Sequence, residues 1–237
     1  MTNILVITGT GTGVGKTVAT AAIAALASAA GKAVAVVKPA QTGVRTGDPD
    51  SDVPDTDTVT RLSGVTDTHE LARYPDPLSP EAAARVSGLP PLDVTAAAGY
   101  ITKLAAEREL VLVEGAGGLL VRYDPAGTTL ADLALALAAP VLVVATAGLG
   151  TLNHTALTRE ALRARGLECA GVIIGSWPAG PGLAARENLA DLPVAAGAEL
   201  AGILPDGAGA LGREEFLNVA RASLSTSLGG QLITVIA

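Results

Sequence analysis

The sequence is poor in aromatic and sulfur-containing residues. Its 237 residues include one Trp, three Tyr, one Phe, one Cys and one Met, and aromatic residues make up 2% of the chain. The apolar core must therefore be built from small aliphatic side chains, mainly alanine and valine, as in folds whose helices pack closely on both faces of a parallel sheet. The single cysteine, Cys169, excludes an intramolecular disulfide, and its apolar surroundings in the sequence place it in the core.

Positive charge and long apolar runs are also scarce. The 16 Lys and Arg residues are outnumbered by 23 Asp and Glu residues, for a net charge of −7. Because nucleic-acid-binding surfaces are basic, we expect no nucleic-acid partner. No apolar run reaches membrane-spanning length without interruption, and no basic-then-apolar signal segment opens the chain. These absences predict a soluble, cytoplasmic protein without a membrane partner. We also expect a single domain over 1–237, with an apolar tail at about 228–237 to which we assign no role.

Glycine, by contrast, is abundant and is concentrated in one stretch, Gly9-Thr10-Gly11-Thr12-Gly13-Val14-Gly15-Lys16-Thr17. An apolar run at 4–7 precedes it, and an alanine-rich segment, expected to be a helix over 16–30, follows it. Backbone N–H groups of such a turn converge at the positive end of the helix dipole and bind phosphate. Lys16 would contact the outer phosphates, and the Thr17 hydroxyl would ligate Mg²⁺. The pattern predicts a nucleotide-binding P-loop, although Gly9 stands one residue earlier than the usual spacing requires.

Further apolar runs predict the strands of a parallel sheet, at 33–37, 110–113, 141–145, 170–174 and 200–204. Ligands of open α/β sheets bind at the carboxyl ends of the strands. Lys38 follows the first of these runs, and Pro39 ends the strand directly after it. This favours a functional lysine over a solvated surface lysine. Glu114 follows the second run and is succeeded by glycines, in a Walker B-like pattern that indicates a magnesium ligand. The expected fold class is α/β, a mostly parallel sheet with helices on both faces, as in P-loop NTPases.

Helices are also expected over 56–63, over 94–107, and from Pro80 with Ser79 as its cap. The stretch 46–57 between these elements is acidic and rich in proline and glycine, which is typical of a flexible surface loop. One or two of its carboxylates are candidate magnesium ligands, and composition alone leaves the choice open among Asp48, Asp50, Asp52, Asp55 and Asp57.

Two more regions carry candidate binding groups. The helix expected to end near Arg165 begins close to Asn153, and its free N–H groups suit a substrate carboxylate. His154, in its first turn, is interpreted as structural. The strands that end at 175–176 and 205–207 lie on the ligand edge and are candidates to flank a nucleotide base.

Four motifs stand in order along the chain: GTGTGVGKT at 9–17, KPAQTG at 38–43, VEGAGGLL at 113–120 and LGTLNHT at 149–155. On these motifs and the elongated P-loop, the chain resembles the dethiobiotin synthetase family of biotin biosynthesis over almost its whole length. The resemblance implies an ATP- and magnesium-dependent ligase that closes a cyclic urea. In that reaction 7,8-diaminononanoate takes up CO₂, supplied by bicarbonate, as a carbamate. The carbamate attacks the γ-phosphate of ATP, and the second amine then displaces phosphate.

The resemblance also implies roles for individual residues. Lys38 would stabilise the carbamate and the transferring phosphoryl group, and Lys16 would hold the β- and γ-phosphates. Thr12 would face the reacting groups, and Thr42 would hydrogen-bond the diamine. Magnesium would be held by Thr17, Asp55 and Glu114, with Asp57 as the alternative to Asp55. The rest of the nucleotide site would comprise Gly13, Val14, Gly15, Val18, Gly115, Ala116, Gly117, Gly175, Ser176, Pro205, Asp206 and Gly207.

In this family the substrate carboxylate is held by a helix start that the neighbouring subunit contributes. The resemblance therefore implies a homodimer in which Gly150, Thr151, Leu152 and Asn153 face the partner's Lys38. Two departures from the family pattern are visible. Many relatives carry Asn-Asp where this chain has Gly175-Ser176, which leaves the choice between ATP and other nucleoside triphosphates open. Relatives often have Ser-Pro-His where this chain has Ser79-Pro80-Glu81.

The main alternative is a partition- or division-type switch ATPase of the same P-loop branch. Such proteins carry an additional lysine five residues before the GKT lysine, and that position here is Gly11. A related amide-forming domain of cobalamin synthesis would normally continue into a domain with a nucleophilic cysteine. A non-catalytic remnant is disfavoured, because the charged residues that the chemistry requires are all present.

Overall fold

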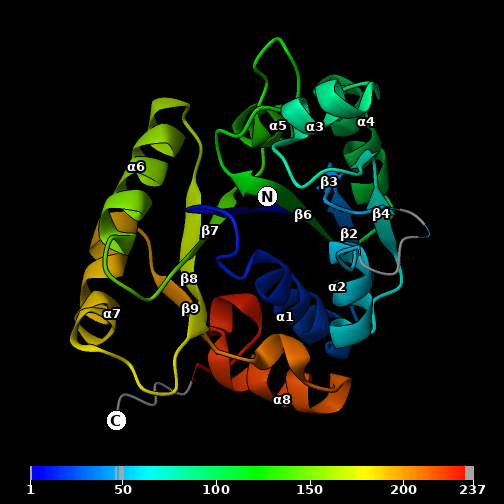
Figure 1. The fold of residues 1–237 in the computed structure, drawn as a ribbon. Coiled ribbons are helices and arrows are strands. Elements are labelled where there is room, and N and C mark those ends of the chain that lie inside the picture. The colour runs from blue at the N-terminus through cyan, green and yellow to red at the C-terminus, as the bar shows by residue number, and fades with distance from the viewer. Residues whose placement is uncertain (1, 46, 48–50, 233–237) are drawn as a thin grey trace.

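The computed structural model describes residues 2–45, 47 and 51–232, and a parallel seven-stranded sheet forms its centre (Figure 1). The strand order is β4-β2-β6-β1-β7-β8-β9. Because β1 has β6 on one side and β7 on the other, the strand order reverses direction at β1, which is where open α/β sheets bind ligands. The strands are β1 (Ile4–Gly9), β2 (Val34–Lys38), β4 (Thr68–Glu70), β6 (Leu110–Gly118), β7 (Val141–Ala145), β8 (Cys169–Trp177) and β9 (Leu200–Pro205).

Helices cover both faces of the sheet, as predicted (Figure 1). One face carries α1 (Lys16–Ala29), α2 (Asp55–Ser63) and α8 (Arg213–Ser223). The other carries α3 (Pro80–Ser87), α4 (Val94–Ala105), α5 (Leu130–Ala136), α6 (Thr151–Ala164) and α7 (Leu183–Ala196). Two single 3₁₀ turns, η1 (Ala208–Ala210) and η2 (Thr226–Leu228), flank α8. Among the described residues, no helix combines the length and the apolar character needed to cross a membrane.

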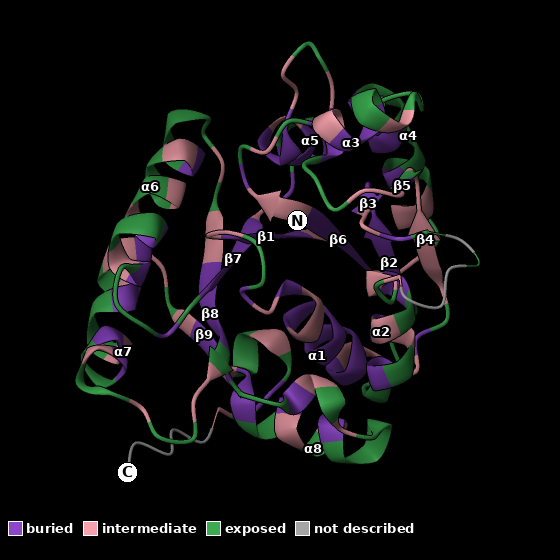
Figure 2. Cartoon of the chain, in the orientation of Figure 1, coloured by how far each residue is buried: buried purple, intermediate pink, exposed green. Residues whose placement is uncertain are grey.

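The core follows from the alternation of side chains along each strand. Val6 and Val113 face α4 and α5, whereas their neighbours in sequence, Ile7 and Leu112, face α1. Much of α1 is buried (Figure 2). Five of its nine buried residues are alanines, namely Ala19, Ala21, Ala22, Ala24 and Ala25. These short side chains let the helix lie close to the sheet, which brings the first turn of α1 near the strand ends.

A second, two-stranded parallel sheet lies beside the first one. It pairs β3 (Gln41–Thr42) with β5 (Arg73–Tyr74). Strands of two residues have no periodicity for a sequence to reveal, and neither was expected. The pair holds the KPAQTG segment against the rest of the chain just beyond the end of β2.

The main strands and helices confirm the predicted ones, with several corrections. The helix expected from 56 begins at Asp55, so this carboxylate lies in a first helical turn and not in a loop. Glu114 and Gly175 do not close their strands, because β6 continues to Gly118 and β8 to Trp177. Ser79 occupies the cap position of α3, but its side chain makes no capping hydrogen bond.

Three helices were not anticipated, namely α5, α7 and α8. Cys169 begins β8 and is partly buried against the core, where burial raises the pKa of its thiol. The candidate ligands Asp48 and Asp50, and the tail residues 233–237, lie outside the described residues.

Candidate active site

The glycine-rich turn joins β1 to α1 as predicted, and it is held in place by a close contact with β8. Gly15 has a φ of 92°, which favours glycine, and a Cβ at that position would lie 2.5 Å from the carbonyl oxygen of Gly175. A Cβ on Gly175 would in turn lie 2.0 Å from the carbonyl oxygen of Val14. Two glycines far apart in the sequence thus allow the turn to rest on the neighbouring strand.

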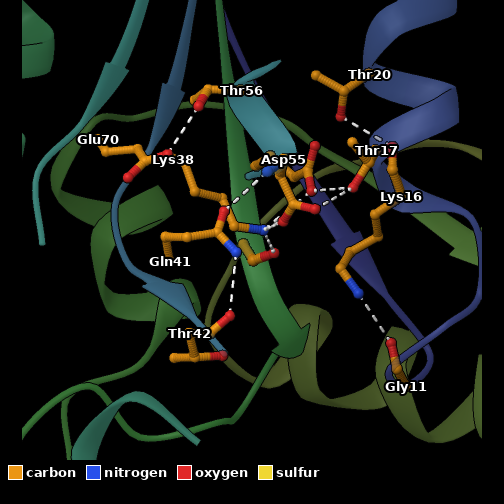
Figure 3. A network of polar contacts seen from close by, with 12 residues as sticks. Gly11, Lys16, Thr17, Thr20, Lys38, Gln41, Thr42, Asp55, Thr56 and Glu70 are labelled. Carbon is orange, nitrogen blue, oxygen red and sulfur yellow. Dashed lines mark hydrogen bonds and ion pairs between the residues drawn. The ribbon is translucent and has the colours of Figure 1, made fainter. Parts of the chain in front are cut away.

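Within the turn, the lysine is folded back on its own loop. The Nζ of Lys16 donates a hydrogen bond to the carbonyl oxygen of Gly11 at 3.0 Å (Figure 3). Lys16 is 8% exposed, and burial, together with the nearby charge of Lys38, lowers its pKa. The ammonium therefore lies at the mouth of the loop, at the place where phosphate binds in P-loops.

Next to the loop, Lys38, Asp55 and Glu114 form one ionic cluster (Figure 3). The Nζ of Lys38 pairs with Asp55 Oδ2, lies 3.0 Å from Glu114 Oε1, and donates to the carbonyl oxygen of Gly115 at 3.2 Å. Thr17 joins the cluster from α1, because its hydroxyl lies 3.0 Å from Asp55 Oδ1 and 2.8 Å from Glu114 Oε1. Four side chains from four elements therefore meet within hydrogen-bonding distance.

This convergence has a simple cause in the sheet. Lys38 has the same side-chain parity as Val36 in β2, and Glu114 has the same parity as Leu112 in β6. Val36 and Leu112 are register partners that face α1. Two residues further along, the side chains of Lys38 and Glu114 lie side by side on the same face, directly opposite the first turn of α1.

The charges of the cluster stabilise one another. Burial opposes the charged form of Lys38, but Glu114 and Asp55 overcome it and raise the pKa of Lys38 above its usual value. Burial likewise opposes ionisation of Asp55, yet the charge and hydrogen bond of Lys38 and the hydrogen bond from Thr17 lower its pKa. The lysine is cationic and Asp55 is anionic at neutral pH.

The cluster also has the donor set that a magnesium ion requires. Glu114 is 1% exposed, and its Oε2 is buried without a hydrogen-bond partner, so a lone carboxylate oxygen is available for a cation. Asp55 and the Thr17 hydroxyl supply further oxygens. Among the described residues, no group of three or more His, Cys, Asp or Glu side chains is placed to bind a metal. This donor set fits Mg²⁺, which uses few protein carboxylates and completes its octahedron with phosphate and water.

A cavity of about 850 Å³ opens beside this cluster. Most residues predicted for phosphate, metal and diamine binding line it. These are Thr12, Gly13, Gly15, Lys16, Thr17, Val18, Lys38, Thr42, Asp55, Glu114, Ala116 and Gly117. Val14 and Gly115 are not among its lining residues, although the carbonyl of Gly115 contacts Lys38. The structure therefore brings together the residues expected at the reacting end of the substrates.

The residues predicted to flank the base lie elsewhere on the same edge. Gly175 and Ser176 belong to the end of β8, and Pro205 closes β9. The Ser176 hydroxyl donates to Asp206 Oδ1 at 2.8 Å, which joins the two strand ends. Gly207 follows in a left-handed conformation, with φ 77°. None of this group lines the 850 Å³ cavity.

The residues predicted for the substrate carboxylate are also separate from the cavity. Gly150 caps the start of α6, and Thr151, Leu152 and Asn153 form its first turn. The preceding residue, Leu149, is 95% exposed. Neither this helix start nor Leu149 lines the cavity that holds Lys38 in the same chain.

Sequence reasoning missed several residues of the cavity. Val53, Pro77 and Leu78 line it, as do Gln41 and the Ser79-Pro80 start of α3. Asp52, one of the five candidate aspartates, also lines it. Gln41 was quoted only as part of the KPAQTG motif. Its buried side chain accepts a hydrogen bond from the backbone N–H of Asp55 at 3.0 Å, a contact across 14 residues of chain that no local pattern reveals.

Comparisons with known proteins agree with this geometry. A family model described as an AAA domain matches residues 3–209. The chain is 61% identical to the ATP-dependent dethiobiotin synthetase BioD of Parafrankia sp. (strain EAN1pec), over 96% of this chain and 94% of that protein. It is 65% identical to the protein of the same name from Frankia casuarinae, over 95% of this chain and 93% of that protein. It is 60% identical to the protein of the same name from Streptomyces avermitilis, over 96% of this chain and 94% of that protein.

Solved structures support the fold. The cell division ATPase MinD of Pyrococcus furiosus matches with a TM-score of 0.53 and 20% identity, over 92% of this chain and 90% of that one. MinD of Aquifex aeolicus matches with a TM-score of 0.55 and 16% identity, over 92% of this chain and 87% of that one. Likeness at this level extends to the P-loop NTPase fold alone, whereas the relatives above share the sequence almost end to end. The chain belongs to the AAA-domain family and, within it, to the ATP-dependent dethiobiotin synthetases.

Proposed function

We propose that this chain is an ATP-dependent dethiobiotin synthetase that closes the cyclic urea of dethiobiotin from 7,8-diaminononanoate, CO₂ and ATP. The observation that carries the proposal is the convergence of Lys16, Thr17, Lys38, Asp55 and Glu114 on one cavity. Two cations and a magnesium-type donor set in one place suit a reaction in which anionic oxygens of two substrates must approach each other.

Phosphate binding falls to the P-loop. Gly13, Gly15, Lys16 and Thr17 line the cavity at the start of α1, where backbone N–H groups of a P-loop bind phosphate. Lys16 would leave the Gly11 carbonyl to reach the β- and γ-phosphates. Thr17, Asp55 and Glu114 would hold Mg²⁺. When bound, the ion neutralises charge on the transferring phosphoryl group.

Lys38 stabilises the reacting oxygens. A carbamate oxygen forms a bond to the γ-phosphorus while the bond to the ADP oxygen breaks, and negative charge is shared between carbamate and phosphate during this step. The buried, positively charged Lys38 can orient the carbamate and offset that charge, with Thr12 lining the same cavity. The second amine then attacks the carbamoyl carbon, phosphate leaves with the bonding electrons, and the amine loses a proton.

The remote carboxylate of the diamine is assigned to the start of α6 in a second copy of the chain. Thr42 lines the cavity near Lys38 and suits the amine end. The helix start at Gly150 to Asn153 offers free N–H groups but lies away from the cavity of its own chain. A homodimer with shared sites accounts for both facts, and the exposed Leu149 beside the helix start suits a protein interface.

The nucleotide base is assigned to the ends of β8 and β9. The Ser176–Asp206 pair supplies a hydroxyl and a carboxylate there, and neither shows by itself a preference for adenine. ATP is the expected co-substrate by membership of the family, and selectivity among nucleoside triphosphates is a property to measure.

The proposal is tested by phosphate release from ATP and Mg²⁺, with and without 7,8-diaminononanoate and bicarbonate. We expect release only when both co-substrates are present, with dethiobiotin formed in equal amount. Release that ignores the diamine would contradict the proposal and support a switch ATPase. Turnover with another triphosphate but not with ATP would retain the reaction and correct the co-substrate.

A further inference from the structure

Helix α2 begins without a cap of its own. Its N-cap residue is Pro54, which has an N-cap-type backbone (φ −53°, ψ 141°) but no side-chain acceptor, and no side-chain capping hydrogen bond forms within the helix. The first N–H groups of a helix have no partner inside it, and an uncapped start is less stable. Asp55, the first residue of α2, is therefore the residue most affected.

Gln41 of β3 supplies the missing acceptor. Its Oε1 accepts the backbone N–H of Asp55 at 3.0 Å, while its Nε2 donates to the carbonyl oxygen of Thr42 at 3.1 Å (Figure 3). The second bond fixes which end of the amide faces α2. Gln41 is 5% exposed, and its own N–H donates to the carbonyl oxygen of Ala72 at 2.9 Å. The acceptor thus belongs to a buried side chain on a paired strand.

The three proposed metal ligands differ in how firmly the fold holds them. Glu114 lies within the central strand β6, and Thr17 lies in the first turn of α1 against the sheet. Asp55 instead begins a helix that is entered from the acidic segment 46–54. The direction of its carboxylate, toward Thr17 and Lys38, therefore depends on where α2 begins.

We propose that Gln41 is a positioning residue of the magnesium site, which fixes the start of α2 so that the Asp55 carboxylate stays within reach of the metal. Gln41 need not touch the metal or the substrate for this role. The inference rests on the proposed function only in taking Thr17, Asp55 and Glu114 as the metal site.

The primary test is Gln41→Leu, which keeps most of the side-chain volume and removes the acceptor. The probe is Mn²⁺, titrated by electron paramagnetic resonance into protein saturated with a non-hydrolysable ATP analogue. We expect the dissociation constant for Mn²⁺ to rise about 3- to 10-fold, as the loss of one buried hydrogen bond would cause. Hydrogen exchange of the Asp55 amide should accelerate, while binding of the analogue without metal should not change.

A second substitution distinguishes capping from packing. Pro54→Ser places a natural N-cap residue at the start of α2. Its hydroxyl would accept the N–H of Thr56 or Asp57, and so stabilise the same helix start through a different N–H from the one that Gln41 binds. In the Gln41→Leu background it should restore Mn²⁺ affinity to within about twofold of the wild type. Gln41→Asn, which stays polar but is one methylene too short to reach α2, should behave like Gln41→Leu, and it serves if the leucine variant does not fold.

The matched control is Asn3→Leu. The Asn3 side chain also bridges two segments, with hydrogen bonds to the carbonyls of Ala105 and Arg108, but Asn3 directly precedes β1 and so lies at the amino end of the strand, away from the P-loop. This variant should lower thermal stability and leave Mn²⁺ affinity unchanged. Unchanged Mn²⁺ affinity in Gln41→Leu, or a loss that Pro54→Ser fails to restore, would overturn the proposal. Because Mn²⁺ binding requires no diamine, these outcomes are independent of whether dethiobiotin is formed.

Discussion

Lys38 occupies the position between the two carboxylates where a bound cation would be expected. It pairs with Asp55 and lies 3.0 Å from Glu114, so one buried ammonium balances two buried or half-buried carboxylates. Buried charges are stable only when they are paired and hydrogen-bonded. A magnesium ion on the same carboxylates would compete with Lys38 for their oxygens, and its arrival would release the ammonium toward the substrate side of the cavity.

The residue-scale prediction concerns Lys38→Ala. Turnover should fall by at least about 100-fold, because a fixed charge at the reacting oxygens is lost. Nucleotide binding should largely survive, since Lys16 and the P-loop are intact. In the absence of nucleotide, calorimetry should show tighter Mg²⁺ binding than in the wild type, because the competing ammonium is gone. Near-normal turnover would contradict the role assigned to Lys38.

Three of the four cluster residues were predictable from their local sequence. Lys38 and Glu114 each follow an apolar run, and Thr17 follows the P-loop lysine. Asp55 was different, because the five aspartates of 46–57 look alike in composition and only the family resemblance favoured it. In the structure Asp55 contacts Thr17 and Lys38 whereas Asp57 is exposed, so Asp55 is the ligand that we propose.

At the scale of elements, the contact between the P-loop and β8 fixes the phosphate site. A Cβ on residue 175 would lie only 2.0 Å from the carbonyl oxygen of Val14. The strand and the loop therefore approach each other more closely than any residue with a side chain would allow. The same strand continues to Ser176, which pairs with Asp206 of the base-side edge. The end of β8 therefore connects the P-loop with the end of β9, the two places proposed for the phosphates and for the base.

Gly175→Ala should consequently weaken nucleotide binding. The added methyl group must displace backbone atoms, which costs about 1–3 kcal/mol, and we expect the dissociation constant for ATP to rise about tenfold or more. Gly180→Ala is the control, because a Cβ there meets no heavy atom within 4 Å. Calorimetric titration with ATP measures both. Equal affinities for the two variants would show that the close approach is dispensable.

Elements with a marked local pattern were predictable from sequence, but length alone was not enough, because the 14-residue helix α7 was not anticipated. The long apolar strands β1, β6 and β7 and the alanine-rich helix α1 were identified from sequence. The sheet of β3 and β5 was not, because its strands have two residues each and are stabilised by partners distant in sequence. Gln41 belongs to this small sheet, so its hydrogen bond with Asp55 could not be predicted from the sequence either.

At the scale of the whole molecule, one edge of the sheet carries every proposed binding group. These groups all lie at the carboxyl ends of the parallel strands (Figure 1). They are the P-loop, the ends of β2 and β6, the start of α6, and the ends of β8 and β9. Within one chain, however, the start of α6 does not line the cavity beside Lys38. A two-fold dimer would bring Lys38 of one copy to the α6 start of the other and complete two sites together.

Mixing two impaired variants tests this arrangement. Lys38→Ala removes the charge at the reacting end, and Asn153→Asp places a negative charge where the substrate carboxylate is assigned. Each variant alone should be slow at low diamine concentration. After subunit exchange, half of the dimers are mixed and each has one intact site, so about a quarter of wild-type activity should return. No recovery in a mixture shown to exchange subunits would place both residues in the site of the same chain.

The sequence by itself determined the fold class and the P-loop, and it singled out Lys16, Thr17, Lys38 and Glu114 as candidate site residues, which line one cavity. These features follow from local patterns, namely the spacing of glycines and the residue that follows each apolar run. The tertiary structure alone decided that Lys38 pairs with both Asp55 and Glu114, that Gly175 must be glycine, and that the side chain of Gln41 accepts the N–H of Asp55 at the start of α2. Each of these is a contact between elements that are distant in sequence, so it depends on strand order and packing, which no local pattern specifies.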